Sequence, residues 1–560
     1  MTLVSFARRA SALAALLPAA ACMRTAASVD ALPSPTTATA PSPDPRVGLR
    51  AGWFDAGQAI WNLRQVSTTR PSAQFLNLST PGEGRLTNSD LAFTGNLVFQ
   101  GNYSGWQVWD ISNPAHPTLR QAYVCPGSQS DVTVYRNLLF VSAEATNSRS
   151  DCGLQGVADT VSTERARGIR IYDISDISRP RPITIVQTCR GSHTNTLVTD
   201  PNDPNNVYIY VSGSAGVRSA SELAGCSGAQ MEEDPNTALF RIEVIQVPLA
   251  NPAAAHIVTS PRIFSGLAAP ARHGETPADS AAAAARFAAS GRPPRPQGPR
   301  TGPTQCHDIT VYPAIGLAGG ACAGYGLLLD IRDVKNPVRI GQVADSNFSF
   351  WHSATFSNDG SKILFSDEWG GGSAPRCRDT DKMEWGSDAI FTIEDNKLKF
   401  HSYYKMPAPQ TAQENCVAHN GSLIPIPGRD VMVQAWYQGG LSVFDWTDAD
   451  HPKEIAFFDR GPVAADRLAQ GGSWSAYWYN GLIVSSEIAR GLDVYELLPS
   501  PLLSANEIAA AKTVKMTYWN TQDQQKLVWP PSFALARAYL DQLARSNGIA
   551  PDTIAAARTA

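Results

Sequence analysis

The chain has 560 residues, a formal net charge of −4, 9% aromatic residues, 43 glycines and 40 prolines. This weak charge, with no basic stripe, excludes nucleic acid as a partner. Glycine and proline are too frequent for long helices through most of the chain, so the composition favours an all-β fold with ample apolar material for a core.

The N-terminus predicts export. Two arginines, Arg8 and Arg9, lead into an apolar run over residues 10–17, and small residues follow at 19–21. This order is typical of a secretory signal, and the run is too short to span a bilayer. We therefore expect the mature protein in the periplasm or at the cell surface.

Cys22 directly follows the small residues, as in the lipobox of bacterial lipoproteins, although Ala19 stands where leucine is usual. Residues 1–22 are thus expected to form a signal with a lipid anchor on Cys22, the alternative being an ordinary cleaved signal. Residues 23–46 are mostly Ala, Ser, Thr and Pro and are predicted to be a flexible tether between the membrane and the fold.

A repeated unit spans most of the chain. Its clearest copy, LAFTGNLVFQGNYSGWQVWDISNPAHPTLRQAYV, alternates four apolar strands with turns. Such a small sheet cannot bury both faces alone, and radial packing of successive sheets covers them. The sequence therefore predicts a seven-bladed β-propeller over residues 47–503. The units begin at Asp90, Asp131, His193, His307, His352, His419 and Ser475.

Three segments accompany the repeats. The last unit shows three strands, so residues 58–69 are expected to supply its fourth, with a strand on the outside of the ring as the alternative. Residues 263–303, rich in Ala, Pro, Gly and Arg, are predicted to be a flexible insertion. Residues 504–560 are predicted to be a small helical extension, because Ser504 and Glu507 form a capping box and a helical pattern ends at Gly548.

The third strand and the turn after it resemble the LVIVD repeat of bacterial surface and periplasmic proteins. The resemblance covers four units well and three loosely. It implies the propeller fold more than any activity. The four segments are GWQVWDISNPAHP, GIRIYDISDISRP, GLLLDIRDVKNP and GLSVFDWTDADHP.

Eight cysteines remain besides Cys22. Four stand just before the first strand of a unit and four follow a second strand, and these places lie on one face of the ring when strands are antiparallel. Thiolate metal sites are disfavoured, because no C-x-x-C pair occurs and an exported protein meets an oxidising compartment. The expected disulfides are Cys125–Cys152, Cys189–Cys226, Cys306–Cys322 and Cys377–Cys416.

Alignment of the first strands gives one column of residues that should line one mouth of the central channel. Four of the nine histidines of the chain fall in it. Imidazoles that face a common axis predict a mononuclear site for a transition metal ion, Fe, Cu or Zn. A polar, water-filled mouth is the alternative. The column reads Ser89, Ser130, His193, His307, His352, His419 and Trp474.

The His arrangement is similar to the iron site of carotenoid-cleaving oxygenases and to the His-lined channel of selenium-binding proteins, which include methanethiol oxidases. The likeness is one of arrangement only. Metal-bound histidines usually donate their second nitrogen to a carboxylate or carbonyl. Candidates for this role, with water-facing loop carboxylates as the alternative, are Glu144, Glu368 and Glu487 at the ends of second strands and Asp308 after His307.

Two functions fit these features. The first is a metal-dependent oxidoreductase that acts on a small substrate at the axis. The second is a non-enzymatic surface or periplasmic lipoprotein whose ring face binds a protein or glycan. The chain has no G-x-S-x-G elbow, phosphate loop or dinucleotide fingerprint, so any chemistry would belong to the metal.

Overall fold

The structure is a computed structural model that describes residues 34–559, except residue 82 and the segments 272–275 and 290–301. The predicted signal, Cys22 and residues 23–33 of the predicted tether lie outside the described residues. No helix within the described ranges is long and apolar enough to cross a membrane.

Within the described residues, the strands form seven antiparallel units of four. The first contains β3 (Asn88–Thr94), β4 (Leu97–Asn102), β5 (Gly105–Asp110) and β6 (Thr118–Val124). The second contains β7 (Val132–Tyr135), β8 (Leu138–Ala143), β9 (Gly168–Asp173) and β10 (Arg181–Gln187). The third contains β11 (Thr196–Thr199), β12 (Asn206–Val211), β13 (Glu243–Pro248) and β14 (His256–Thr259).

The remaining units follow the same order along the chain. The fourth contains β15 (Cys306–Tyr312), β16 (Leu317–Cys322), β17 (Tyr325–Asp330) and β18 (Val338–Val343), and the fifth β19 (Trp351–Phe356), β20 (Lys362–Asp367), β21 (Asp388–Glu394) and β22 (Lys397–Tyr404). The sixth contains β23 (Asn420–Ile424), β24 (Val431–Ala435), β25 (Leu441–Asp445) and β26 (Lys453–Arg460), and the seventh β27 (Ser473–Tyr479), β28 (Leu482–Glu487), β29 (Gly491–Leu497) and β2 (Leu63–Thr69).

The first strands of the units form a closed inner ring. Except for the pair of β7 and β11, each contacts the first strand of the next unit, and β27 of the seventh unit contacts β3 of the first. Between the second and third units the link is Asn195, whose backbone N–H donates to Asp131 at 2.9 Å. Apolar clusters lie between neighbouring units; Trp106 of the first, for example, packs with Val134 of the second. This radial packing of four-stranded sheets is the β-propeller arrangement that the repeat predicts.

The N-terminal strand segment closes the ring and also extends it. Strand β2 pairs with β29 and completes the seventh unit, as expected. The preceding β1 (Gln58–Trp61) instead pairs with β26 as a fifth strand of the sixth unit. Asn62 separates the two strands, because it has a left-handed backbone (φ 54°) and its amide donates to the Ile455 carbonyl at 2.8 Å.

Two segments expected to be flexible make specific contacts. Arg46, in the predicted tether, is buried and forms ion pairs with Asp44 at 2.7 Å and with Glu454 of β26 at 2.8 Å. The insertion contains helix α1 (Pro277–Ala289), whose Asp279 pairs with Arg376 at 2.7 Å. Packing against the ring therefore begins before Val47.

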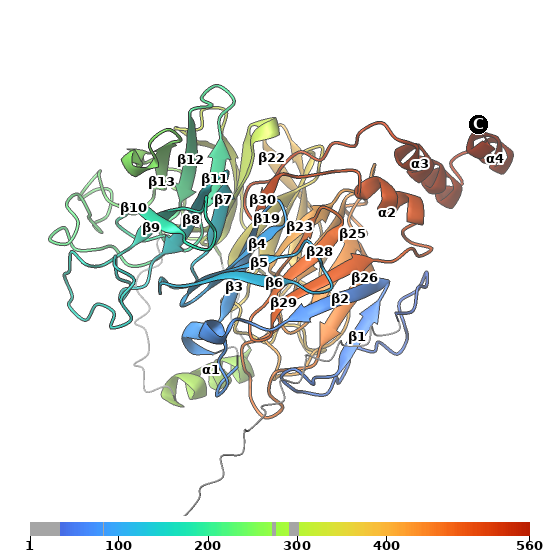
Figure 1. Cartoon of the computed structure of the whole chain (residues 1–560), viewed down its shortest axis with the longest axis horizontal. Coiled ribbons are helices and arrows are strands. Elements are labelled where there is room, and N and C mark those ends of the chain that lie inside the picture. Colours follow the sequence, from blue (N-terminus) through green and yellow to red (C-terminus); the bar gives the residue numbers. More distant parts are fainter. Residues whose placement is uncertain (1–33, 82, 272–275, 290–301, 560) are drawn as a thin grey trace, which may run out of the picture.

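The C-terminal extension contains α2 (Ala505–Ala511), α3 (Phe533–Ser546) and α4 (Pro551–Thr559), grouped at one side of the molecule (Figure 1). The predicted capping box at the start of α2 is present. Helix α3 ends at Asn547, which has a left-handed backbone (φ 54°), one residue before the expected glycine.

Between α2 and α3 the chain crosses the channel, which the sequence did not predict. Strand β30 (Tyr518–Asn520) pairs with the end of β3. Asn520 of β30 bonds to Val134 of β7, and the chain beyond β30 bonds to Val311 of β15 and Phe356 of β19. These strands belong to four different units, so residues 518–524 close the mouth of the channel opposite to the starts of the first strands.

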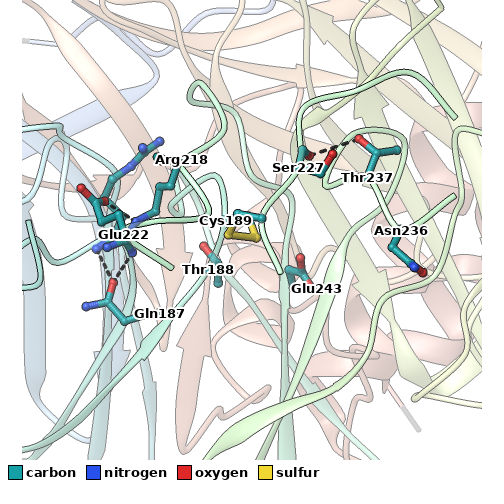
Figure 2. Close-up of a disulfide and its surroundings, with 12 residues drawn as sticks. Gln187, Thr188, Cys189, Arg218, Glu222, Ser227, Asn236, Thr237 and Glu243 are labelled. Carbon is teal, nitrogen blue, oxygen red and sulfur yellow. Dashed lines mark hydrogen bonds and ion pairs between the residues drawn. A yellow bond between two sulfur atoms is a disulfide. The ribbon is translucent and has the colours of Figure 1, made fainter. Parts of the chain in front are cut away.

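The structure holds four disulfides among the described residues, and they are the pairs expected from the sequence. The Cys189–Cys226 bridge joins the loop after β10 to the long loop between β12 and β13 (Figure 2). Beside it, Arg218 donates to Glu222 and to Gln187, each at 2.6 Å, which fixes the same loop to the second unit (Figure 2).

Candidate metal centre

The four histidines of the predicted column lie in one continuous arc. His307 and His352 stand at the starts of β15 and β19, whereas His193 and His419 come just before β11 and β23. The ring centroids of His193 and His307 are 4.6 Å apart, those of His307 and His352 4.0 Å, and those of His352 and His419 4.1 Å. The inner strands thus bring these side chains together at one mouth of the channel.

Three of the described side chains form a compact ligand set. One donor atom from each of His307, His352 and Glu368 lies within 4.8 Å of the other two. The Glu368 carboxylate is also 3.6 Å from Nε2 of His419 and 3.9 Å from Nε2 of His352.

Glu368, predicted from the sequence to be an outer partner, therefore lies among the candidate ligands. Strand β20 runs antiparallel to β19, so the residue after its end comes beside the residue at the start of β19. The compact set accordingly contains two imidazoles and a carboxylate, and the full four-histidine set is not assembled within the same distance.

Three imidazoles are oriented through their Nδ1 atoms. Nδ1 of His193 bonds to Glu144, Nδ1 of His307 to Asp308 at 2.9 Å, and Nδ1 of His419 to the Trp474 carbonyl. Such bonds fix the ring and leave Nε2 to face the centre, as in many metal sites. Glu144 and Asp308 thus occupy the positions expected of outer partners.

Glu487 does not take the outer position that its sequence context suggested. Its carboxylate pairs with Arg490 at 2.7 Å and accepts the Gly472 N–H at 2.8 Å and the Ala489 N–H at 2.8 Å. Since these donors occupy both carboxylate oxygens, Glu487 orders the loop after β28 rather than a histidine.

Buried nitrogens without hydrogen-bond partners mark the centre. Within the described residues, both ring nitrogens of His352 and Nε2 of His419 are buried and unpaired. Leaving a buried polar atom unpaired costs about 1 to 3 kcal/mol. Burial and the neighbouring His307 lower the pKa of His352 well below its ordinary value and the pKa of His419 to about 3. Both rings are therefore neutral at neutral pH, which is the form that binds a metal ion.

His193 has a different charge state. Burial disfavours its cation, but the Glu144 carboxylate outweighs burial and raises the pKa of His193 to about 9. Burial alone would raise the pKa of Glu144, but the interaction with His193 lowers it to about 2. The two residues form an ion pair in this structure, and a protonated imidazole has no lone pair to offer a metal.

Tyr437 is a site residue that the repeat pattern did not reveal. Its hydroxyl donates to Glu368, and its backbone is left-handed (φ 52°), which is unusual for a bulky residue. Two hydrogen bonds hold that backbone: the Tyr437 N–H donates to the Ser473 carbonyl at 3.1 Å, and the Ser473 N–H donates to the Tyr437 carbonyl at 2.8 Å. The surrounding structure therefore holds the phenol against the carboxylate.

The contact between the Tyr437 hydroxyl and the Glu368 carboxylate also requires a glycine at position 372. A Cβ atom there would lie 2.3 Å from the Tyr437 hydroxyl and 2.7 Å from Oε1 of Glu368.

A cavity of about 170 Å³ lies beside the ligand set and is lined by His193, His307, Glu368 and Tyr437. Three further aromatic rings, Tyr103, Phe350 and Trp474, form much of its wall, and Gln129 and Gln470 add amide groups. Since one water molecule takes about 30 Å³, this space suits a small organic molecule or a few waters.

Comparisons with known proteins give no family. No family model and no curated protein matches the chain. Among solved structures, it is similar to a Bacteroides uniformis protein provisionally called a 6-phosphogluconolactonase, with 11% identity over 71% of this chain and 89% of that one and a TM-score of 0.41. The periplasmic gluconolactonase of Pseudomonas aeruginosa has 12% identity, coverage of 74% and 97%, and a TM-score of 0.40. With identities and TM-scores this low, neither the fold nor the activity of those proteins is assigned to this chain.

Proposed function

We propose that this protein is an exported metalloenzyme that binds one transition metal ion at the channel mouth and oxidises a small substrate in the adjacent cavity. The observation that carries the proposal is the set of buried, neutral imidazoles with unpaired nitrogens beside a buried carboxylate. A metal ion would satisfy those nitrogens, whereas a scaffold protein has no use for their cost in stability.

The donor set favours iron among the three metals predicted from the sequence. His307, His352 and Glu368 provide two imidazoles and one carboxylate, the set that non-haem Fe(II) oxygenases use. His419 is the next donor, because its Nε2 is 3.6 Å from Glu368. Iron bound here would supply one-electron and oxygen chemistry.

The chain's own residues would hold the carboxylate and shape the substrate site. Tyr437 orients Glu368 through its hydrogen bond, and Asp308 orients His307. The aromatic walls of the cavity exclude bulk water and favour a small, partly apolar substrate, and its two glutamine amides can bind a polar substituent.

The four disulfides support export, because such bonds persist in oxidising compartments. We retain the lipid anchor at Cys22 and the LVIVD-type repeat as parts of the proposal. Neither is needed for the chemistry of the centre.

Elemental analysis tests the function directly. Protein purified without oxygen and supplied with Fe(II) should retain about one iron per chain after desalting, as expected for one ligand set. Nitric oxide should then give an iron–nitrosyl EPR signal, which requires an open coordination position. Absence of retained Fe, Cu and Zn would reject the metalloenzyme and favour the scaffold that binds a protein or glycan.

Substitution of Gly372 by alanine should weaken metal binding by about 10- to 100-fold, the range seen when a partner that orients a ligand is lost. The new methyl group would displace Tyr437 and Glu368, which a Cβ would approach to 2.3 and 2.7 Å. Gly371→Ala is a matched control, because Gly371 also has a positive φ (61° against 69°) but a Cβ there meets nothing within 4 Å. Titration with Fe(II) measures both variants, and equal affinities would contradict the role of the Tyr437–Glu368 contact.

A further inference from the structure

A second ring of polar side chains lies one layer further into the channel. Six of its members directly follow the residues of the His column along the first strands, and in the third unit the position is two residues on. All are buried. The ring consists of Asp90, Asp131, Asn195, Asp308, Ser353, Asn420 and Ser475.

Hydrogen bonds connect this axial ring from unit to unit. Asp131 accepts the side-chain amide of Asn195 at 3.2 Å as well as its backbone N–H. On the other side, Asp90 accepts the Asn420 amide at 2.8 Å and the Tyr477 hydroxyl at 2.6 Å. The Asn420 amide reaches past the seventh unit to do so, which shows that the channel is narrow here.

Four buried oxygen atoms of the axial ring form no hydrogen bond of ordinary geometry in the described part of the chain. They come from two carboxylates, an amide and a hydroxyl, and no nitrogen of the ring is among them. The atoms are Oδ1 of Asp131, Oδ1 of Asn195, Oδ2 of Asp308 and Oγ of Ser475. The Gln522 side chain approaches the Asp308 carboxylate, and the Tyr477 hydroxyl approaches Ser475.

The charges of the axial ring are also uncompensated. No ion pair involves Asp90 or Asp131 among the described residues, and the Asp308 carboxylate contacts the imidazole of His307 and the side-chain amide of Gln522. Burial raises the pKa of Asp90 and of Asp131, and the charges of neighbouring acidic residues raise both further. Carboxylates so far from water require a proton or a cation.

Other residues cover the axial ring on both sides. The His cluster lies above the ring, and residues 518–524 cross the mouth below it. Gln522 of that segment is buried, and its carbonyl accepts the Val311 N–H at 2.8 Å. A bound ion would therefore be shielded from solvent.

We propose that the axial ring binds a hard divalent cation, with Ca²⁺ preferred, through oxygens of Asp131, Asn195, Asp308 and Ser475. Carboxylate, amide and hydroxyl oxygens are the ligands that Ca²⁺ takes, and its flexible coordination accepts water at the remaining positions. Asp90 adds negative charge from the neighbouring unit. This site is separate from the nitrogen-containing centre above it, and the proposal does not depend on the proposed enzyme activity.

Asp308 would join the two sites. Its Oδ1 bonds to Nδ1 of His307 at 2.9 Å, while Oδ2 is one of the four oxygens without a hydrogen bond of ordinary geometry. A cation below would therefore fix the carboxylate that orients a ligand of the upper centre.

The test uses the whole protein, treated with EGTA and titrated with Ca²⁺ or Mg²⁺. Equilibrium dialysis with radioactive Ca²⁺ should show one site per chain, and Ca²⁺ should raise the Tm by several degrees. Asp131→Asn should bind Ca²⁺ at least tenfold more weakly and lose the shift in Tm. Asp448→Asn, in an exposed turn, is the control and should behave as wild type.

His352→Ala separates this site from the upper centre, because that variant should lose iron and keep Ca²⁺. Failure of the unmodified protein to bind either Ca²⁺ or Mg²⁺ would overturn the proposal. A Tm of Asp131→Asn equal to or above that of the wild type in Ca²⁺ would overturn it as well, because removal of a protonated or repelling carboxyl would then be harmless.

Discussion

Replacing His352 by alanine should abolish iron binding at the channel mouth. His352 is central in the arc, with ring centroids 4.0 Å from His307 and 4.1 Å from His419, and it belongs to the compact ligand set. Loss of a ligand should cost more than the roughly 10- to 100-fold in affinity that loss of an outer partner costs. Titration with Fe(II) and the metal content of the purified variant measure the effect.

The metal-free variant should lose little stability. Both nitrogens of His352 are buried and unpaired, so removal of the ring relieves about 1 to 3 kcal/mol per unpaired atom and offsets the cavity that it leaves. Without metal, wild type and His352→Ala should therefore unfold at similar temperatures, whereas Fe(II) should stabilise the wild type alone.

His451→Ala is the matched control, because His451 is an exposed histidine in a surface turn. It should keep wild-type iron content and Tm. Full retention of iron by His352→Ala would show that the imidazole nitrogens are not ligands, and the metalloenzyme proposal would then fail.

The fold was predictable because its unit repeats. Four apolar strands with turns recur at similar spacing, and a sheet of that size has few ways to cover both faces. Strand β30 carries no such signal: it has three residues, lies between two helices and is held by contacts with β3 and β7, which are far from it in the sequence. The division of residues 58–69 at Asn62 depends likewise on a contact with Ile455, almost 400 residues away.

Of the candidate site, the sequence predicted the column of histidines. Alignment of the first strands brings the histidines together, because these strands are innermost in every unit. The role of Glu368 depends on which way a side chain turns at the end of β20, and that of Tyr437 on a left-handed backbone, so neither follows from periodicity. The axial ring did have a signal, because Asp90, Asp131 and Asp308 each follow a member of the column.

Replacing Asn520 by alanine should lower the free energy of unfolding by about 2 to 6 kcal/mol, since two buried backbone groups would lose their partners at about 1 to 3 kcal/mol each. Oδ1 of Asn520 accepts the Val134 N–H at 2.8 Å, and Nδ2 donates to the Val134 carbonyl at 3.0 Å. The Asn520 side chain thus satisfies backbone groups of β7 as a neighbouring strand would. Because Asn520 is buried, water cannot supply these hydrogen bonds when the side chain is removed. Urea denaturation followed by tryptophan fluorescence measures the loss.

Lys526→Ala, two residues after the crossing segment, is the control, because Lys526 is exposed and its removal should alter stability by less than about 0.5 kcal/mol. The comparison tests the crossing of the channel itself. If residues 518–524 close the mouth, the loss in Asn520→Ala should be accompanied by faster release of Ca²⁺ from the axial ring, because the barrier below it is weakened. Equal stability of the two variants would mean that the segment is not docked in solution, and the enclosure of the axial ring would then lose its lower side.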